Sequence, residues 1–301
     1  MKKTVFLYAG EGTHGPATTA DIFKTSDKWI EMEELLRETL DLDLVHLWNE
    51  NQGSHACPFS PLRTLVSQIC LADLWSQWGY TPDIVAGHST GELSAAFDAG
   101  FYTLPQILAL THDIGLAAAN LDGRMAHGWV SDPKESEIHV SSINFRHRRR
   151  GVHVTLSDFP ERVDAYLAEK PDFTPMPLPH PWHHPAYAPY AAALKPQKSA
   201  KIESGRFISG LTGQWETCLP ATHWQDWMVR PIDFIAAMDT LKAGNPDTGF
   251  TVIEIGAHPV LAPGCRGLGD YIHVPSLCRG EPDGPFIRAQ RNKLEAWGGA
   301  Q

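Results

Sequence analysis

A Gly-x-Ser-x-Gly turn at residues 87–91 limits the folds open to this chain more than any other feature. The turn reads Gly-His-Ser-Thr-Gly, follows a short apolar run at residues 84–86, and precedes a helical pattern that starts at Glu92. A buried strand, a tight glycine-bounded turn and a helix in this order are typical of a nucleophile elbow in an α/β protein. The pattern also fits a surface turn with an ordinary serine, so the motif alone leaves the function open.

A nucleophile elbow places its serine where negative charge is stabilised. Ser89 would lie at the positive, amino-terminal end of the next helix, and the N–H of Thr90 would form half of an oxyanion hole. A serine nucleophile also needs a base within hydrogen-bond reach. The chain has fifteen histidines, so residue type alone does not identify that base.

Composition indicates an ordinary globular protein. The chain has 301 residues, of which 43% are hydrophobic and 20% charged, enough for a large core and roughly two domains. No apolar run approaches the roughly 20 residues of a membrane helix, and the short apolar segment after Lys3 predicts a buried strand rather than a signal peptide. Five scattered cysteines favour a reducing, cytoplasmic compartment without disulfides or a zinc site.

The distribution of charged residues and histidines bears on three kinds of partner: nucleic acid, an acidic carrier domain and a metal ion. The net charge of −10 argues against nucleic acid as a partner. One basic run, Arg146, Arg148, Arg149 and Arg150, is either a solvated turn or a docking patch for an acidic carrier domain or phosphate groups. The histidine-rich segment 179–185 resembles a metal-binding tract, but no matching ligand spacing occurs elsewhere, so we expect no metal.

Hydrophobic periodicity predicts alternating strands and helices interrupted by a β-rich insert. Strands are expected at 5–12, 84–86, 206–211 and 250–255, and helices at 30–40, 62–78, 104–121, 187–194, 224–227 and 234–242. The insert of about sixty residues follows Gly123 and carries strands at 139–143 and 152–156 and a helix at 159–169. A proline-rich connector at 171–185 then leads back to the α/β pattern.

Four separated segments resemble the malonyl-CoA:acyl-carrier-protein transacylase family, the acyltransferases of fatty-acid and polyketide synthesis. Residues 6–14 are similar to its opening F-x-x-P-G-Q-G-S-Q, and residues 71–92 to its A-L-x-x-L-W…G-x-x-P-D…G-H-S-x-G-E block. Residues 182–189 look like F-H-S-P-x-M-x-P, and residues 253–261 look like E-I-G-P-x-x-x-L. Order and spacing hold from Val5 to about Leu261, nearly the whole chain.

The resemblance implies a fold and two catalytic residues. The fold would be an α/β acyltransferase fold with a larger α/β-hydrolase-like domain (residues 1–123 and 182–301) and a small ferredoxin-like subdomain (residues 124–181). Ser89 takes the place of the acylated serine, and His183 that of the general base, because it stands six residues before Pro189 as the family's histidine does before its proline. The backbone carbonyl of Trp227 would orient the base, so that one ring nitrogen is fixed as donor and the other accepts the serine proton.

The resemblance also assigns the surroundings of these two residues. The backbone N–H groups of Glu11 and Thr90 would form the oxyanion hole. His88, Ile114 and Asn144 would line the substrate pocket, in a cleft between the two domains.

Two departures from the family pattern bear on the substrate. Malonyl-specific members carry an arginine that holds the free carboxylate of the substrate, and Ile114 stands at that position. No arginine occurs between Thr64 and Gly123, so we expect a neutral or larger acyl group. Glu11 replaces a glutamine beside the oxyanion hole, where it either points away and pairs, is neutral through burial, or orients a water for hydrolysis.

These features favour an acyltransferase that moves a non-malonyl acyl group between thioesters through an acyl-serine, in polyketide-type biosynthesis. Its expected partner is an acyl carrier protein, with acyl-CoA as an alternative donor and neither nucleic acid nor membrane involved. No cofactor is needed, because the phosphopantetheine thioester is itself the substrate arm. An acyl hydrolase that clears carrier proteins and a non-catalytic carrier-binding module are the alternatives. A general esterase is disfavoured, since it expects an aspartate between the serine and a late histidine.

Overall fold

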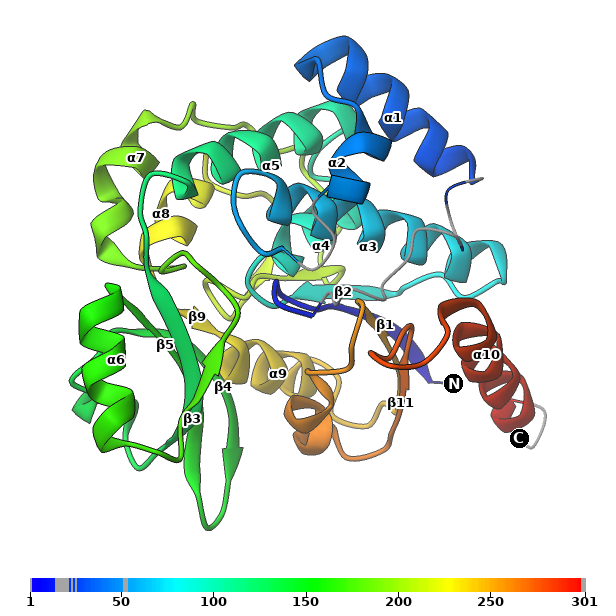
Figure 1. Ribbon diagram of the computed structural model, residues 1–301. Helices are drawn as coiled ribbons and strands as arrows, with labels where there is room; N and C mark the ends of the chain where they lie inside the picture. The colour runs from blue at the N-terminus through cyan, green and yellow to red at the C-terminus, as the bar shows by residue number, and fades with distance from the viewer. Residues whose placement is uncertain (1, 14–21, 23, 25, 51–53, 299–301) are drawn as a thin grey trace.

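The computed structural model describes residues 2–13, 22, 24, 26–50 and 54–298, and within them the chain forms two sheets (Figure 1). The larger sheet has six strands in the order β11-β10-β1-β2-β7-β8, with parallel neighbours except for β7 and β8. Its strands are β1 (Lys3–Tyr8), β2 (Ile84–Gly87), β7 (Phe207–Ile208), β8 (Trp215–Glu216), β10 (Phe250–Ile255) and β11 (Tyr271–Pro275).

The larger sheet lies between two layers of helices. Val5 and Leu7 of β1 pack in a cluster with α9, whereas Phe6 and Tyr8 belong to the core shared with α3 and α5. Burial on both faces is what a central parallel strand requires. The helices are α1 (Asp27–Leu40), α2 (Leu44–Glu50), α3 (Phe59–Gln77), α4 (Gly91–Ala99), α5 (Leu104–Ala118), η2 (Pro185–Tyr187), α7 (Ala188–Ala193), α8 (His223–Val229), α9 (Phe234–Ala243), η3 (Ala262–Leu268) and α10 (Asp283–Gly298).

The smaller sheet forms a second lobe beside the first (Figure 1). Its order is β6-β3-β5-β4-β9, and helix α6 (Pro160–Glu169) packs on it through Val163. The edge strand β9 (Ile232–Asp233) pairs in parallel with β4, although it comes from the segment after residue 182, so the chain crosses between the lobes there. The other elements are β3 (Arg124–Val130), η1 (Pro133–Glu135), β4 (Val140–His147), β5 (Gly151–Asp158) and β6 (Thr174–Met176).

The mixed α/β architecture predicted from the sequence is confirmed, but seven α-helices and strands were not predicted, namely α2, β3, β6, β8, β9, β11 and α10. Strand β3 contains Gly128, which interrupts a strand pattern; a Cβ there would lie 2.6 Å from the ring of Phe173. Strand β11 and helix α10 lie at the edge of the molecule, and α10 buries few apolar residues, so its periodic signal is weak. No helix in the described part of the chain combines the length and apolarity that crossing a bilayer demands.

Two glycines allow the turn between β2 and α4 to pack directly against β1. A Cβ on Gly91 would lie 2.2 Å from the backbone oxygen of Tyr8, and a Cβ on Gly87 would lie 2.3 Å from the nitrogen of Glu92. The N–H of His88 donates to the same Tyr8 oxygen at 2.9 Å. The glycines of the sequence motif are therefore required by the space available to them.

We expect Gly91→Ala to lower the free energy of unfolding by about 3 kcal/mol or more, because the new methyl group meets rigid backbone rather than a movable side chain. Gly267→Ala is the matched control, since a Cβ there meets nothing within 4 Å. It should change stability by less than about 0.5 kcal/mol. Denaturant unfolding of both variants measures the difference, and equal stabilities would contradict the packing described here.

Candidate active site

Ser89 stands at the turn between β2 and α4 in a strained backbone conformation. Its φ is 53°, in the left-handed region that non-glycine residues rarely occupy. The turn directs the hydroxyl out of the larger sheet, and Ser89 Oγ donates to His183 Nε2 at 2.7 Å. The structure thus brings together the two residues that the sequence predicted as nucleophile and base.

His183 lies in the loop before η2 and is also left-handed, with a φ of 56°. Its Nδ1–H donates to the backbone carbonyl of Trp227 at 2.7 Å, and its ring meets the Trp227 indole edge-on at 4.5 Å. The carbonyl therefore fixes the tautomer that leaves Nε2 free to accept the serine proton. Burial lowers the pKa of His183 to about 3, opposed by the Trp227 carbonyl, so the base is neutral at physiological pH.

The backbone at Gly10 and Glu11 lies against the serine. A Cβ on Gly10 would be 3.3 Å from Ser89 Cβ, so this segment and the elbow are in contact. In the part of the chain that the structure describes, the N–H groups of Glu11 and Thr90 donate to no protein acceptor. Two unused N–H groups beside a serine are the arrangement that an oxyanion hole needs.

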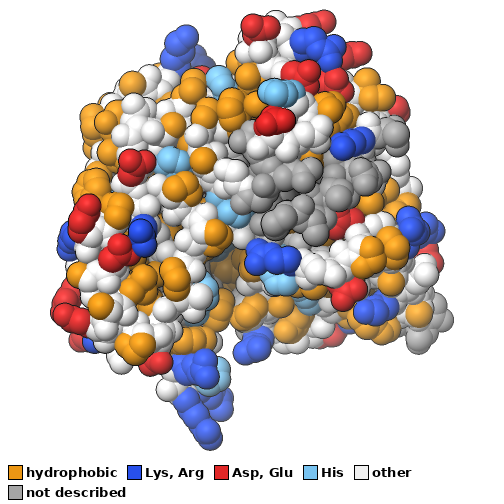
Figure 2. Space-filling view, in the orientation of Figure 1, with side chains coloured by type: hydrophobic (Ala, Val, Ile, Leu, Met, Phe, Trp, Pro, Cys, Tyr) orange, Lys and Arg blue, Asp and Glu red, His pale blue; other side chains and the backbone are white. Residues whose placement is uncertain are grey.

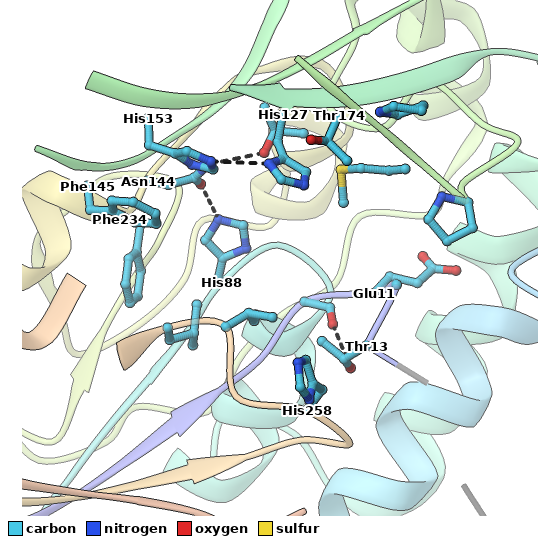
Figure 3. A pocket seen from close by; sticks show the side chains of 18 of the residues that line it. Glu11, Thr13, His88, His127, Asn144, Phe145, His153, Thr174, Phe234 and His258 are labelled. Carbon is cyan, nitrogen blue, oxygen red and sulfur yellow. Dashed lines mark hydrogen bonds between the residues drawn. The ribbon is translucent and has the colours of Figure 1, made fainter. Parts of the chain in front are cut away.

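The side chain of Glu11 is turned away from His88, towards helix α3 (Figure 3). Burial raises its pKa to about 7, opposed by Ser60, by the Arg63 guanidinium and by Thr90. A pKa of about 7 leaves the Glu11 carboxyl neutral below pH 7 and about half ionised at pH 7, which is closest to the alternative in which burial makes it neutral. The sequence analysis did not select Arg63, because nothing in the local sequence indicates that it lies near Glu11. The packing of helix α3 brings the two side chains close together.

Two neighbouring cavities lie at the site, and the residues that line both of them include Glu11, His88 and Thr155. The smaller, of about 40 Å³, is lined by Ser89 and His183 and by apolar side chains of the small lobe and the connector, among them Met125, Met176 and Trp182. The larger, of about 460 Å³, lies between the two lobes and shares His88 and other residues with the smaller one. Figure 2 shows the surface hollowed at this place. The cleft predicted between the lobes is thus present.

A chain of polar side chains forms one wall of the larger cavity (Figure 3). His88 Nε2 and Asn144 Oδ1 are 2.8 Å apart, Asn144 Nδ2 donates to Thr155 Oγ1 at 3.1 Å, and His153 joins Asn144 to His127 with contacts of 3.2 Å. His88 comes from the elbow and the others from the small lobe, so the wall connects the two lobes. The structure places both His88 and Asn144 in the pocket, as the sequence analysis expected.

Ile114 does not take the place that the sequence analysis gave it. Its side chain is fully buried in the core of the large lobe and lines neither of the two cavities. The reason is packing: the next residue, Gly115, presses its helix α5 against Pro58, where a Cβ would lie 2.3 Å from the backbone oxygen. The prediction that Ile114 lines the substrate pocket is therefore wrong. Position 114 still carries no positive charge.

The predicted basic run occupies the tip of the β4–β5 hairpin, which projects from the small lobe (Figures 1 and 2). Arg146, Arg148, Arg149 and Arg150 are all exposed. Arg146 reaches across to Asp239 of helix α9 at 3.0 Å. A third cavity of about 410 Å³ lies there, with Lys242 and Arg266 in its lining, and it shares Asn144 and Phe145 with the larger catalytic cavity.

Comparisons with known sequences agree with this geometry. The acyl transferase domain family matches residues 5–123. The reducing polyketide synthase ppsB of Aspergillus oryzae is 29% identical over 228 residues, which cover 67% of this chain and 9% of that protein. The pikromycin polyketide synthase component PikAII of Streptomyces venezuelae is 27% identical over 284 residues, which cover 86% of this chain and 7% of that protein. The chain thus spans less than a tenth of the length of these relatives.

Solved structures show the same fold. The acyltransferase domain from module 8 of the salinomycin polyketide synthase aligns with a TM-score of 0.81 at 23% identity, covering 98% of this chain and 75% of that one. MCAT from Streptococcus pneumoniae aligns with a TM-score of 0.72 at 18% identity, covering 97% and 100%. The acyltransferase fold predicted from the sequence is confirmed. The family match over residues 5–123 and the shared fold support an acyltransferase, as the resemblance in the sequence implied.

Proposed function

We propose that this acyltransferase moves a neutral, non-malonyl acyl group between thioesters through an ester on Ser89. The observation that carries the proposal is the hydrogen bond of 2.7 Å from Ser89 Oγ to His183 Nε2, in a cavity between the lobes, with His183 oriented by the Trp227 carbonyl. This is the arrangement by which a neutral imidazole activates a serine hydroxyl.

The reaction would proceed in two balanced half-reactions. Ser89 Oγ attacks the thioester carbonyl while its proton passes to His183 Nε2, and the N–H groups of Glu11 and Thr90 stabilise the oxyanion. Collapse of the tetrahedral intermediate breaks the carbon–sulfur bond, and the leaving thiolate takes the proton from His183. A second thiol then repeats these steps in reverse order and carries the acyl group away.

The lining of the smaller cavity supports a neutral acyl group. Among the described residues that line it, none is a lysine or arginine, and Met125, Leu178 and Trp182 offer apolar surface. The buried Arg63 donates to the carbonyl of Ser54 at 2.6 Å and lies near Glu11, so its charge is already engaged. Arg279 lines the larger cavity, but it donates to the carbonyls of Gly12 and Thr13 at 3.1 and 3.2 Å. A substrate carboxylate at Ser89 would therefore lose its hydration without gaining a cationic partner that is not already engaged, which costs several kcal/mol.

We expect acetyl, propionyl and butyryl thioesters to acylate Ser89 at least about tenfold faster than malonyl thioester, since a missing carboxylate partner costs more than 1.4 kcal/mol. Quenched-flow intact-mass spectrometry with each acyl-CoA or acyl-pantetheine measures the rates. Ser89→Ala is the control and should take up no acyl group. Malonylation as fast as acetylation would reject the specificity, and release of free acid without an acceptor thiol would identify a hydrolase instead.

Glu11 gives the acylation step a defined pH dependence. Below about pH 7 its carboxyl is neutral; above that it ionises and opposes the negative charge developing beside its own backbone N–H. We expect the rate of Ser89 acylation to fall about three- to tenfold as the pH rises through 7, with no fall between pH 7 and 5 because His183 stays neutral there.

The Glu11→Gln variant should abolish this decline, because its side chain has no charge to gain. The exposed Glu38 supplies the control variant, Glu38→Gln, which should keep the profile of the unmodified protein. A profile in Glu11→Gln that still falls near pH 7 would show that Glu11 does not control the step.

We further propose that the acyl donor or acceptor is an acyl carrier protein in polyketide-type biosynthesis, as the polyketide synthase relatives suggest. The support from the structure is the exposed basic tip of the β4–β5 hairpin, which projects from the small lobe of a chain whose net charge is −10. An acidic carrier and its phosphate would be attracted to this patch and kept away from the rest of the surface.

We expect Arg148→Glu with Arg149→Glu to raise the KM for an acyl carrier protein about tenfold at low salt and much less at 0.5 M salt, because screening removes long-range attraction. Arg288→Glu with Lys293→Glu is the control, since it makes the same charge change on the exposed face of α10. Equal KM values for the two double variants would reject the docking patch. Acylation from a pantetheine thioester should be unchanged in both.

A further inference from the structure

The small lobe reaches the catalytic loop through one histidine that the mechanism above does not use. His139 directly precedes strand β4, and its Nε2–H donates to the backbone carbonyl of His183 at 2.8 Å. We propose that His139 is a positioning residue that holds the catalytic base in its strained conformation and thereby makes acyl transfer depend on the placement of the small lobe.

The His139 ring is itself held in place. The carbonyl of His139 accepts from the N–H of Ser157 on β5 at 2.9 Å, which anchors the residue to the smaller sheet. Its ring meets the ring of His184 edge-on at 4.9 Å, with an interplanar angle of 79°. The carbonyl can only accept, so Nε2 carries a proton, and burial lowers the pKa of His139, which favours the neutral ring.

The backbone of His183 needs such a donor. With a φ of 56°, the residue occupies a region that a non-glycine residue keeps only when its surroundings fix it. The Ser89 and Trp227 contacts hold the ring of His183, whereas the His139 contact holds its carbonyl. Without that contact the peptide after His183 can rotate towards a relaxed conformation, which swings the imidazole away from Ser89.

A second contact ties the same loop to the small lobe. His184 Nε2 lies 3.8 Å from Asp158 Oδ1, a buried carboxylate at the end of β5 that also pairs with Arg162 at 2.8 Å. The small lobe therefore meets two adjacent residues of the catalytic loop, through a hydrogen bond at His183 and a longer contact at His184. Ser89 and the ring of His183 are held from the large lobe by the elbow and by Trp227, so the His139 contact makes the position of the base depend on the small lobe as well.

The test compares three variants in single-turnover acylation of Ser89, and it rests on the proposed acyl-serine chemistry. His139→Ala should reduce the acylation rate and kcat about 10- to 100-fold with KM changed less than about twofold, because a misplaced base slows chemistry without affecting binding. His139→Gln should recover most of the rate, since its amide N–H reaches the same carbonyl. His46→Ala, on the exposed face of α2, is the control and should match the unmodified protein.

Three outcomes would overturn the inference. The first is a folded His139→Ala protein whose Ser89 is acylated at the normal rate. The second is a His139→Gln protein that is as slow as His139→Ala. The third is a crystal structure of His139→Ala in which the φ of His183 and the distance from Ser89 Oγ to His183 Nε2 are unchanged, whatever the activity.

If His139→Ala does not fold, His139→Asn replaces it in the test, because the asparagine amide is one carbon too short to reach the carbonyl of His183. Failure of the unmodified protein to be acylated by any thioester rejects the proposed function instead.

Discussion

The hydrogen bond between Ser89 and His183 joins two residues 94 positions apart, and both ends of it are strained. A left-handed conformation costs a non-glycine residue roughly 1–2 kcal/mol, so neither would keep it in isolation. Ser89 is held because the glycines beside it let the elbow press against β1. His183 is held by hydrogen bonds at its ring and at its carbonyl. The position of each end is thus set by backbone packing in a different part of the molecule.

Burial controls the charges around this hydrogen bond. Burial keeps the base neutral, and it raises the pKa of Glu11, a carboxyl beside the predicted oxyanion hole, to about 7. The nearby cation, Arg63, is occupied by a backbone carbonyl and by its proximity to Glu11. Few fixed charges therefore face the reacting carbonyl, which suits a neutral acyl group. The strong positive charge lies far out on the hairpin, where it can act on a partner without perturbing the chemistry.

Ile114 stands where malonyl-specific members of the family carry an arginine, but it does not line the substrate pocket as that position suggests. Ile114 is part of the core and contacts neither cavity, so it does not shape the pocket by its own surface. An isoleucine at this position lacks the positive charge of the family's arginine. The walls of the smaller cavity include Met125, Met176 and Trp182. Met125 and Met176 belong to segments that the family motifs do not include, whereas Trp182 stands beside His183 in one of these motifs, which gave no reason to place it in the pocket.

Local sequence determined the elements that depend on short-range chemistry. The apolar run, the glycines and the serine of residues 84–91 predicted the elbow, because a tight turn between a strand and a helix needs those residue types in that order. The resemblance to a family added His183 and the Trp227 carbonyl, which the structure brings within hydrogen-bond distance. The edge elements β11 and α10 escaped notice, because their buried apolar residues are too few to create a periodic signal.

Only the tertiary structure decided which groups meet across the two lobes. The direction of the Glu11 side chain, the approach of Arg63 and the reach of His139 to the His183 carbonyl all depend on how helices and sheets pack over long sequence separations. Fifteen histidines could not be ranked from the sequence, since a histidine's role is set by the groups that its two ring nitrogens meet. The sequence thus determined the strand, turn and helix around Ser89, whereas packing determined which groups meet the ring nitrogens of His183 and which side chains line the cavities.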